Sequence, residues 1–202
     1  MIPLAKRKTK EKQPIVIPDK YTLLAADLSL KRPGFCLLNV QRDGDSVKID
    51  KIAIVSVDNK TKVKPRGQLL YEIAFCASEL LSNAKEPLFL VREQSINNCG
   101  GKIAHSSTAA RTGISSVVGV MDLLAWQHRQ HSWDEIYPVT VKKLLTGNCK
   151  AEKNEVAAAL SRYLEGASYK NDDESDAAAV AVAWLISHNQ IKQIIQEDKL
   201  SE

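Results

Sequence analysis

Residues 22–40 read TLLAADLSLKRPGFCLLNV. Two apolar runs flank the turn signal Pro33-Gly34, a pattern that favours two strands of an antiparallel hairpin. Asp27 then lies near the end of the first strand, where a carboxylate is costly to bury unless it is paired or binds a cation. A turn is the alternative explanation, because Asp often begins turns, and on this stretch alone the turn is the simpler one.

The segments that follow alternate between strand-like and helix-like patterns. Further strands are predicted where short apolar and β-branched runs occur, over residues 47–57, 88–91 and 136–139. Helices are predicted where apolar residues recur at helical spacing, over residues 68–82, 107–130, 140–145, 153–164 and 172–187. Three antiparallel strands followed by alternating strands and helices predict an α/β fold, with a mixed sheet that carries helices on its faces.

The composition indicates one globular domain. The chain has 202 residues, of which 44% are hydrophobic, enough for a substantial core. The longest uncharged apolar run, residues 177–186, is far shorter than the roughly 20 residues that span a bilayer, and no early apolar run resembles a signal peptide. We therefore expect no membrane association and a cytoplasmic location, in a bacterial cell or in the host of a virus. The scattered cysteines, which form no C-x-x-C pair, are expected to be reduced thiols: Cys36, Cys76, Cys99 and Cys149.

The net charge of +4 is concentrated at the N-terminus. Residues 1–20 contain six basic and two acidic side chains, so the rest of the chain is neutral. Such an arm is often a flexible nucleic-acid contact, and Lys6, Arg7 and Lys8 are its candidate contact residues. A solvated terminus without a partner is the equal alternative. The predicted organisation is an arm over residues 1–20, a domain over 21–190 and a tail over 191–202.

Four carboxylates stand at the predicted ends of structural elements: Asp27 and Glu93 after strands, and Asp173 with Asp176 at the start of the last helix. Residues three apart share one helix face, so the last two can point into a common site. Acids gathered at one sheet edge would repel each other unless divalent cations lay between them. Oxygen ligands select Mg²⁺ or Mn²⁺, and a pair of ions is the usual device for hydrolysing a phosphodiester. Each acid alone is a weak signal, and the ordered set carries the prediction.

The chain resembles the RuvC-like Holliday-junction resolvases of the ribonuclease H-like superfamily. The first shared motif is a strand that ends in Asp and is followed by Gly and an aromatic, and the second is a strand before Glu-Gln. The third is Pro-x-x-Val-Lys, Thr-Gly and Ala-x-Lys-x-x-Val, and the fourth is Asp-x-x-Asp-Ala before an apolar helix. Together they extend over about residues 22–188. The matching residues are Asp27, Gly34, Phe35, Glu93, Gln94, Pro138, Val141, Lys142, Thr146, Gly147, Ala151, Lys153, Val156, Asp173, Asp176 and Ala177.

This resemblance implies a ribonuclease H-like sheet of three antiparallel and two parallel strands. It also implies a Mg²⁺-dependent endonuclease with two ions per active site, in which Mn²⁺ can substitute, that resolves four-way DNA junctions. The four carboxylates would be the metal ligands, and Lys142 and Lys153 would steady the scissile phosphate, with Lys153 counted among the catalytic residues. Without the resemblance, both lysines would be taken as surface residues. Further candidate DNA contacts are Lys143, Lys150, Arg111 and Ile96, the last standing where some relatives carry an aromatic wedge.

The helix bearing Arg111, Thr112 and Gly113 resembles the dimer-forming helix of the family, which implies a homodimer. Its small residues would permit close approach, and its apolar residues would supply contact area, although packing within one monomer is an equally simple explanation. The proposed interface residues are Gly113, Ser116, Val117, Gly119, Val120 and Leu124. The sequence departs from the family pattern directly after Asp27, where Leu28-Ser29 replaces Pro-Gly.

Two other functions compete with the resolvase. One is a ribonuclease H-like nuclease for RNA or for flaps and other branched DNA, and the Thr-Gly and Ala-x-Lys segment argues for the resolvase over it. The other is a non-catalytic nucleic-acid-binding protein that kept the fold. Retention of all four carboxylates argues against that second alternative, because clustered negative charge is costly in a mere scaffold.

Overall fold

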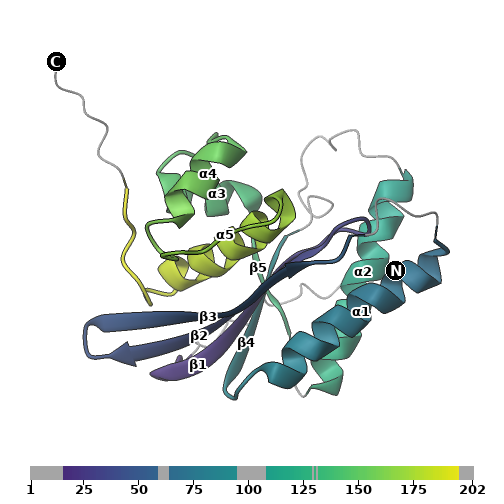
Figure 1. Cartoon of the computed structure of the whole chain (residues 1–202), viewed down its shortest axis with the longest axis horizontal. Coiled ribbons are helices and arrows are strands. Elements are labelled where there is room, and N and C mark those ends of the chain that lie inside the picture. The colour runs from purple at the N-terminus through teal and green to yellow at the C-terminus, as the bar shows by residue number, and fades with distance from the viewer. Residues whose placement is uncertain (1–15, 59–63, 95–107, 129, 131, 196–202) are drawn as a thin grey trace, which may run out of the picture.

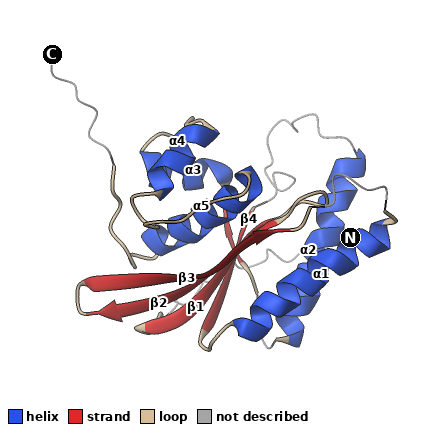
Figure 2. Cartoon of the chain, in the orientation of Figure 1, coloured by secondary structure: helices blue, strands red, loops and turns tan. Residues whose placement is uncertain are grey.

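A twisted five-stranded sheet forms the centre of the computed structural model, which describes residues 16–58, 64–94, 108–128, 130 and 132–195 (Figure 1). The strands are β1 (Lys20–Asp27), β2 (Gly34–Asp43), β3 (Ser46–Ser56), β4 (Leu88–Glu93) and β5 (Asp134–Ile136). The helices are α1 (Arg66–Asn83), α2 (Thr108–Gln127), α3 (Pro138–Thr146), α4 (Lys153–Leu160) and α5 (Asp172–Ser187) (Figure 2).

The strand order is β3-β2-β1-β4-β5, with β1 in the middle. β1 pairs antiparallel with β2, in a register that sets Asp27 opposite Gly34, and β2 pairs antiparallel with β3. β4 runs parallel to β1, and β5 runs parallel to β4. The predicted mixed sheet of three antiparallel and two parallel strands is therefore confirmed.

Helices cover both faces of the sheet and bury two separate apolar cores. α3, α4 and α5 pack over one face, where Leu23, Cys36 and Trp184 lie in the core. α1 and α2 pack over the other face, against Leu24 and Phe35. Neighbouring residues of β1 point to opposite faces, as the pleat of a strand requires, so the same strand supplies both cores.

Helix α5 is buried along almost its whole length. Residues 177–186, the apolar run noted in the sequence, are all buried between the sheet and the α3–α4 pair. An apolar helix of this kind is a core element, because every side of it meets protein rather than water. Within the described residues, no helix combines the length and the apolarity that crossing a membrane requires.

Two predicted boundaries differ from the structure around Pro138. The fifth strand ends at Ile136 and not at Val139, because Pro138 occupies the first turn of α3, where its fixed φ angle suits a helix start. α3 ends at Gly147, whose φ of 80° is left-handed and therefore suits glycine. The next helix, α4, ends at Leu160 and gives way to turns, whereas the sequence pattern predicted a helix to residue 164.

The predicted dimer interface on α2 needs correction. Gly113 is buried, and a Cβ there would lie 3.3 Å from the Leu30 side chain. Val117 is fully buried in the core shared with α1. Neither residue is available to a partner chain, because packing within the monomer already uses them. The outward face of α2 instead carries Leu123 and Trp126, which are 57% and 68% exposed.

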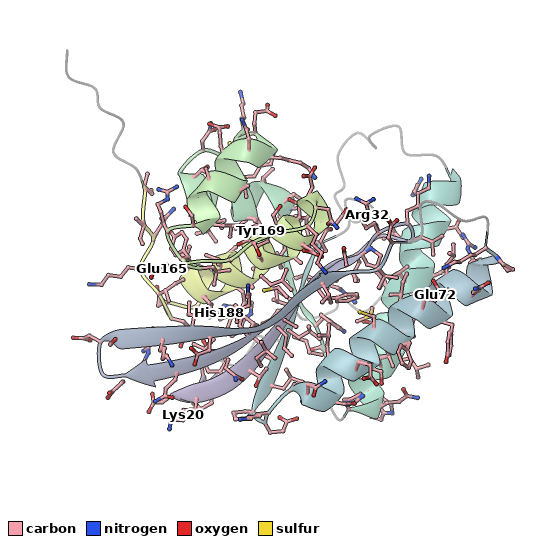
Figure 3. All side chains as sticks on the ribbon, viewed as in Figure 1. Lys20, Arg32, Glu72, Glu165, Tyr169 and His188 are labelled. Carbon is pink, nitrogen blue, oxygen red and sulfur yellow. The ribbon has the colours of Figure 1, made fainter. Side chains whose placement is uncertain are left out.

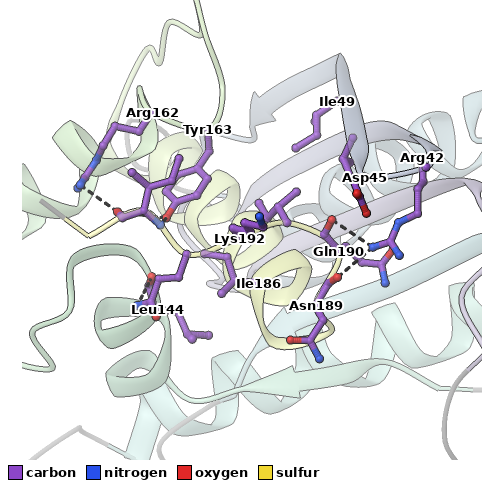
Figure 4. A pocket seen from close by; sticks show the side chains of 15 residues that line it. Arg42, Asp45, Ile49, Leu144, Arg162, Tyr163, Ile186, Asn189, Gln190 and Lys192 are labelled. Carbon is purple, nitrogen blue, oxygen red and sulfur yellow. Dashed lines mark hydrogen bonds between the residues drawn. The ribbon is translucent and has the colours of Figure 1, made fainter.

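A cavity of about 900 Å³ lies at the end of α5 remote from Asp27, between the β2–β3 hairpin and the segment that follows α5 (Figure 4). Arg42 donates to the carbonyl oxygens of Asn189 and Gln190 at this cavity. Farther along the same segment, Gln193 donates to the carbonyl oxygens of Lys143 and Leu144 at the end of α3. This cavity contains none of the predicted carboxylates. The described cysteines, Cys36, Cys76 and Cys149, are free thiols, and Cys99 lies outside the described residues.

Candidate active site

Three of the four predicted carboxylates line one cleft at the carboxyl ends of the central strands. Asp27 ends β1 and Glu93 ends β4, and because these neighbouring strands are parallel, their ends meet at the same sheet edge. Asp176 reaches the cleft from the first turns of α5, which packs against β1, β2 and β4. The cleft has a volume of about 310 Å³. Its other lining residues are Pro138, Val141, Lys142, Lys153, Val156 and Ala179.

Gly34 allows α5 to approach the sheet. A Cβ at this position would lie 1.9 Å from the carbonyl oxygen of Asp173, a distance that no side chain tolerates. The glycine of the first motif is therefore needed for close approach of a helix backbone and not for a positive φ angle. Because the same backbone carries Asp173 and Asp176, this contact sets how far both acids stand from Asp27.

A buried carboxylate that the sequence analysis did not single out also fixes the start of α5. Glu174 is 2% exposed and accepts hydrogen bonds from the backbone N–H of Lys170 at 2.8 Å and from Ser56 Oγ at 3.2 Å. Asn171 caps the helix by accepting from the Glu174 N–H, and its amide donates to the same Ser56 hydroxyl. This network ties the helix that bears two candidate ligands to the end of β3.

Arg92, next to Glu93, holds the end of β4 from the opposite face. Its guanidinium donates to Asp122 Oδ1 of α2 at 2.6 Å and to Glu135 Oε1 of β5 at 2.8 and 3.0 Å, and it lies 6.0 Å from the centre of the Trp133 ring. Successive residues of a strand alternate between faces, so Arg92 pointing toward α2 leaves Glu93 pointing into the cleft. Sequence reasoning missed this role because only the fold brings the two acids to Arg92.

The strand carboxylates resist ionisation. Burial raises the pKa of Asp27 from 3.8 to about 6, and the nearby charges of Asp176 and Asp173 add to the increase, while Lys153 opposes it. Burial likewise raises the pKa of Glu93 from 4.5 to about 7, with further contributions from Asp27 and Asp176. Both carboxyl groups therefore stand in a poorly solvated site where negative charge has accumulated, an environment that a cation would relieve.

The two helix carboxylates are paired with cationic side chains. Lys153 Nζ lies 2.7 Å from Asp176 Oδ2, and its hydrogen bond to that carboxylate raises the pKa of Lys153. Arg32, in the loop between β1 and β2, lies with Nη1 3.5 Å from Asp173 Oδ2. Asp173 is not among the residues that line the cleft. Lys142 also lines the cleft, and its charge opposes the increase in the pKa of Glu93.

The chemistry of this donor set fits divalent metal ions. Hard cations prefer carboxylate oxygens, and Asp27, Glu93 and Asp176 present such oxygens in one cleft. Within the described ranges, no three acidic, histidine or cysteine side chains lie close enough together to hold one metal ion. Two of the acids form ion pairs with cationic side chains, Asp176 with Lys153 and Asp173 with Arg32.

The other predicted contact residues that the structure describes are not among those that line the cleft. Lys143 and Lys150 are exposed on α3 and on the turn after it, and Arg111 is half-buried on α2. Ile96, Lys6, Arg7 and Lys8 lie outside the described residues. The lysines that the sequence placed in the site, Lys142 and Lys153, both line it, whereas Arg32 was not predicted.

Comparisons with known proteins agree with these features. Residues 95–184 match the family described as Crossover junction endodeoxyribonuclease RuvC. A protein of that name from Rickettsia conorii is 30% identical over 170 residues, which are 83% of this chain and 98% of the relative. Another, from Rickettsia bellii, is 27% identical over 146 residues, which are 72% of this chain and 87% of the relative.

Solved structures resemble the fold. The RuvC structure of Thermus thermophilus superimposes with a TM-score of 0.66 at 16% identity, over 84% of this chain and 96% of that one. The same organism's RuvC in complex with Holliday junction substrate gives a TM-score of 0.67 at 16% identity, over 81% of this chain and 92% of that one. At 16% sequence identity, these superpositions show a shared fold only, and they confirm the predicted ribonuclease H-like arrangement of the sheet and helices.

Proposed function

The chain belongs to the RuvC family of crossover junction endodeoxyribonucleases, and we propose that it is a metal-dependent endonuclease that resolves four-way DNA junctions. One observation supports this most strongly: Asp27, Glu93 and Asp176 meet with Lys142 and Lys153 in a single cleft. Paired acids with basic neighbours suit an anionic substrate whose phosphorus is attacked by water. The Rickettsia relatives bear the name of such an enzyme.

The metal in this proposal is Mg²⁺, with Mn²⁺ as a substitute and two ions per active site. Asp27, Glu93 and Asp176 would hold the ions, with Asp173 as the fourth ligand. When bound, such ions lower the pKa of a coordinated water and neutralise charge on the phosphate oxygens. The raised pKa values of Asp27 and Glu93 support this proposal, because binding a cation favours their ionised forms.

The lysines of the cleft would orient the DNA backbone. Lys153 approaches from the first turn of α4 and Lys142 from α3, and both line the cleft together with Asp27 and Glu93. A lysine ammonium acts as a point charge for an anionic phosphate oxygen. Lys143 on α3 and Lys150 on the turn after it are both exposed and would extend this contact along the DNA strand. The basic arm would add further phosphate contacts.

A homodimer completes the proposal. Resolution requires two nicks at symmetry-related positions, and a twofold dimer supplies two active sites in matching orientation. With Gly113 and Val117 buried, the candidate contact surface is the outward face of α2, where Ser116 and Gly119 adjoin exposed Leu123 and Trp126. Large apolar side chains exposed on one helix face are typical of an interaction surface.

Cleavage of defined substrates tests this function. The full chain should cut a synthetic four-way junction in Mg²⁺ with paired nicks, and should leave a linear duplex of the same sequence and an RNA–DNA hybrid uncut. Preferential cleavage of the hybrid or of a flap would transfer the assignment to another ribonuclease H-like nuclease. Junction binding without any cleavage in Mg²⁺ or Mn²⁺ would indicate the non-catalytic alternative.

A further inference from the structure

Arg32 stands at the sheet end that carries the acids, opposite the end where Lys20 begins β1 (Figure 3). Its loop is firmly anchored, because the Arg32 N–H donates to Ser29 Oγ at 2.9 Å and the Pro33 carbonyl accepts from the Val57 N–H at 3.1 Å. The side chain is 23% exposed, and its guanidinium lies between the carboxylates of Asp58, which follows β3, and Asp173 of α5. The position of this positive charge is therefore set by the fold and not by a flexible surface loop.

The contacts of that guanidinium are nonetheless poor. Nη1 lies 3.5 Å from Asp173 and Nη2 lies 3.4 Å from Asp58, both longer than the roughly 2.7–2.9 Å of a good charged hydrogen bond. Its Nε is buried and has no hydrogen-bond partner among the described residues. A buried donor without a partner is costly, so this arrangement gains little from its geometry.

Arg92 provides an internal comparison. Like Arg32, it lies between two carboxylates, but it is buried and its hydrogen bonds are short, at 2.6 to 3.0 Å. Its Nε donates to Glu135. Arg92 is thus built as a permanent structural ion pair. The loose geometry of Arg32 beside a candidate metal ligand indicates a partner that is meant to be exchanged.

We propose that Arg32 is the exchangeable counter-ion of Asp173: it neutralises that carboxylate in the metal-free protein and is displaced when a divalent cation binds there. This inference rests on the proposed function, because it takes Asp173 to be a metal ligand. It makes Arg32 a positioning residue that acts through Asp173. Its presence weakens metal binding and keeps Asp173 aligned until the ion arrives.

Direct Mn²⁺ binding without DNA, measured from the electron paramagnetic resonance of the free ion, tests the proposal without relying on activity. Arg32→Gln should bind Mn²⁺ about tenfold more tightly than the unmodified protein, because one positive charge about 6 Å from a divalent ion opposes binding by that factor even at the dielectric constant of water. Arg32→Lys, which keeps the charge, should return the affinity to within about threefold of the original. Lys31→Gln is the matched control, because Lys31 is exposed in the same loop and should change the affinity less than twofold.

A double-mutant cycle then assigns the effect to Asp173. In an Asp173→Asn background, Arg32→Gln should raise Mn²⁺ affinity by clearly less than in the unmodified protein, because the arginine then has no Asp173 carboxylate to neutralise and only its repulsion of the ion remains. Equal affinities of Arg32→Gln and the unmodified protein would overturn the inference, as would an effect of undiminished size in the Asp173→Asn background. The proposed function fails separately, if the unmodified protein neither binds Mn²⁺ nor cuts a junction, whereas intact cleavage with Arg32-independent metal binding refutes this inference alone.

Discussion

Replacing Asp27 with Asn should stabilise the metal-free protein above neutral pH. The Asp27 carboxyl has a pKa of about 6 in the folded chain and 3.8 ordinarily, so folding favours its protonated form. Well below pH 3.8 the group is protonated in both the folded and the unfolded chain and makes no difference to stability. As the pH rises through about 6, the folded state must accept a charge that its surroundings oppose, and stability is lost.

The size of this effect follows from the pKa difference. A difference of about two corresponds to up to roughly 3 kcal/mol of unfolding free energy once the pH exceeds about 7. For a chain of this size that is a rise of roughly 6–12 °C in the melting temperature of Asp27→Asn. The gain should be small at pH 4, develop between pH 4 and 7, and then level off.

Thermal unfolding in EDTA, followed by circular dichroism from pH 4 to 8.5, measures this difference. Asp172→Asn is the control, because Asp172 is exposed at the start of α5 and its loss removes the same charge outside the cleft. Saturating Mg²⁺ should narrow the gap, since only the unmodified site keeps its full ligand set. A melting temperature of Asp27→Asn that follows the unmodified protein at every pH would refute the reasoning that these acids are crowded in a poorly solvated cleft.

Three further changes test how the site is built and presented. Gly34→Ala should lower the unfolding free energy by roughly 1–3 kcal/mol, because the new methyl group displaces the backbone of Asp173, and it should reduce the cleavage rate more than the affinity for DNA. An unchanged melting temperature and cleavage rate would contradict the close approach of α5. Trp126→Glu should convert a dimer to a folded monomer in analytical ultracentrifugation, because a twofold contact would bury the new charge twice. An unmodified protein that is already monomeric would rule out this surface as a dimer interface. Deleting residues 1–18 should weaken binding to all nucleic acids and make the affinity less dependent on salt, because lysines of the arm release counterions from the phosphates when they bind. An unchanged salt dependence would show that the arm does not touch DNA.

The sequence predicted the order of elements from local rules, because apolar runs marked the strands and helical spacing marked the helices. The meeting of Asp27 and Glu93 was implied by the resemblance to the RuvC-like family, and the parallel pairing of β1 with β4 places their carboxyl ends at one edge. The position of Asp176 followed from helical spacing at the start of an apolar helix. These signals are short-range, and they are visible in a single chain.

The supporting interactions could not be predicted, because they join residues that are distant in sequence. Arg32 meets Asp173 across 141 positions, and nothing in the segment KRPG distinguishes it from an exposed turn. Glu174 appeared to be one more acid of a helix start, and only the packing of α5 on β3 buries it. The reverse error occurred on α2, where small and apolar residues suited a dimer contact but Gly113 and Val117 pack within the monomer.

We propose that the acids at this sheet edge carry out metal-dependent cleavage of junction DNA. Cleavage of a four-way junction in Mg²⁺ by the unmodified protein and by Asp27→Asn tests this proposal, with Asp172→Asn as the control for charge. We expect Asp27→Asn to bind the junction with nearly unchanged affinity and to lose cleavage by at least about a thousandfold, while Asp172→Asn cuts normally. Full cleavage by Asp27→Asn would contradict the account.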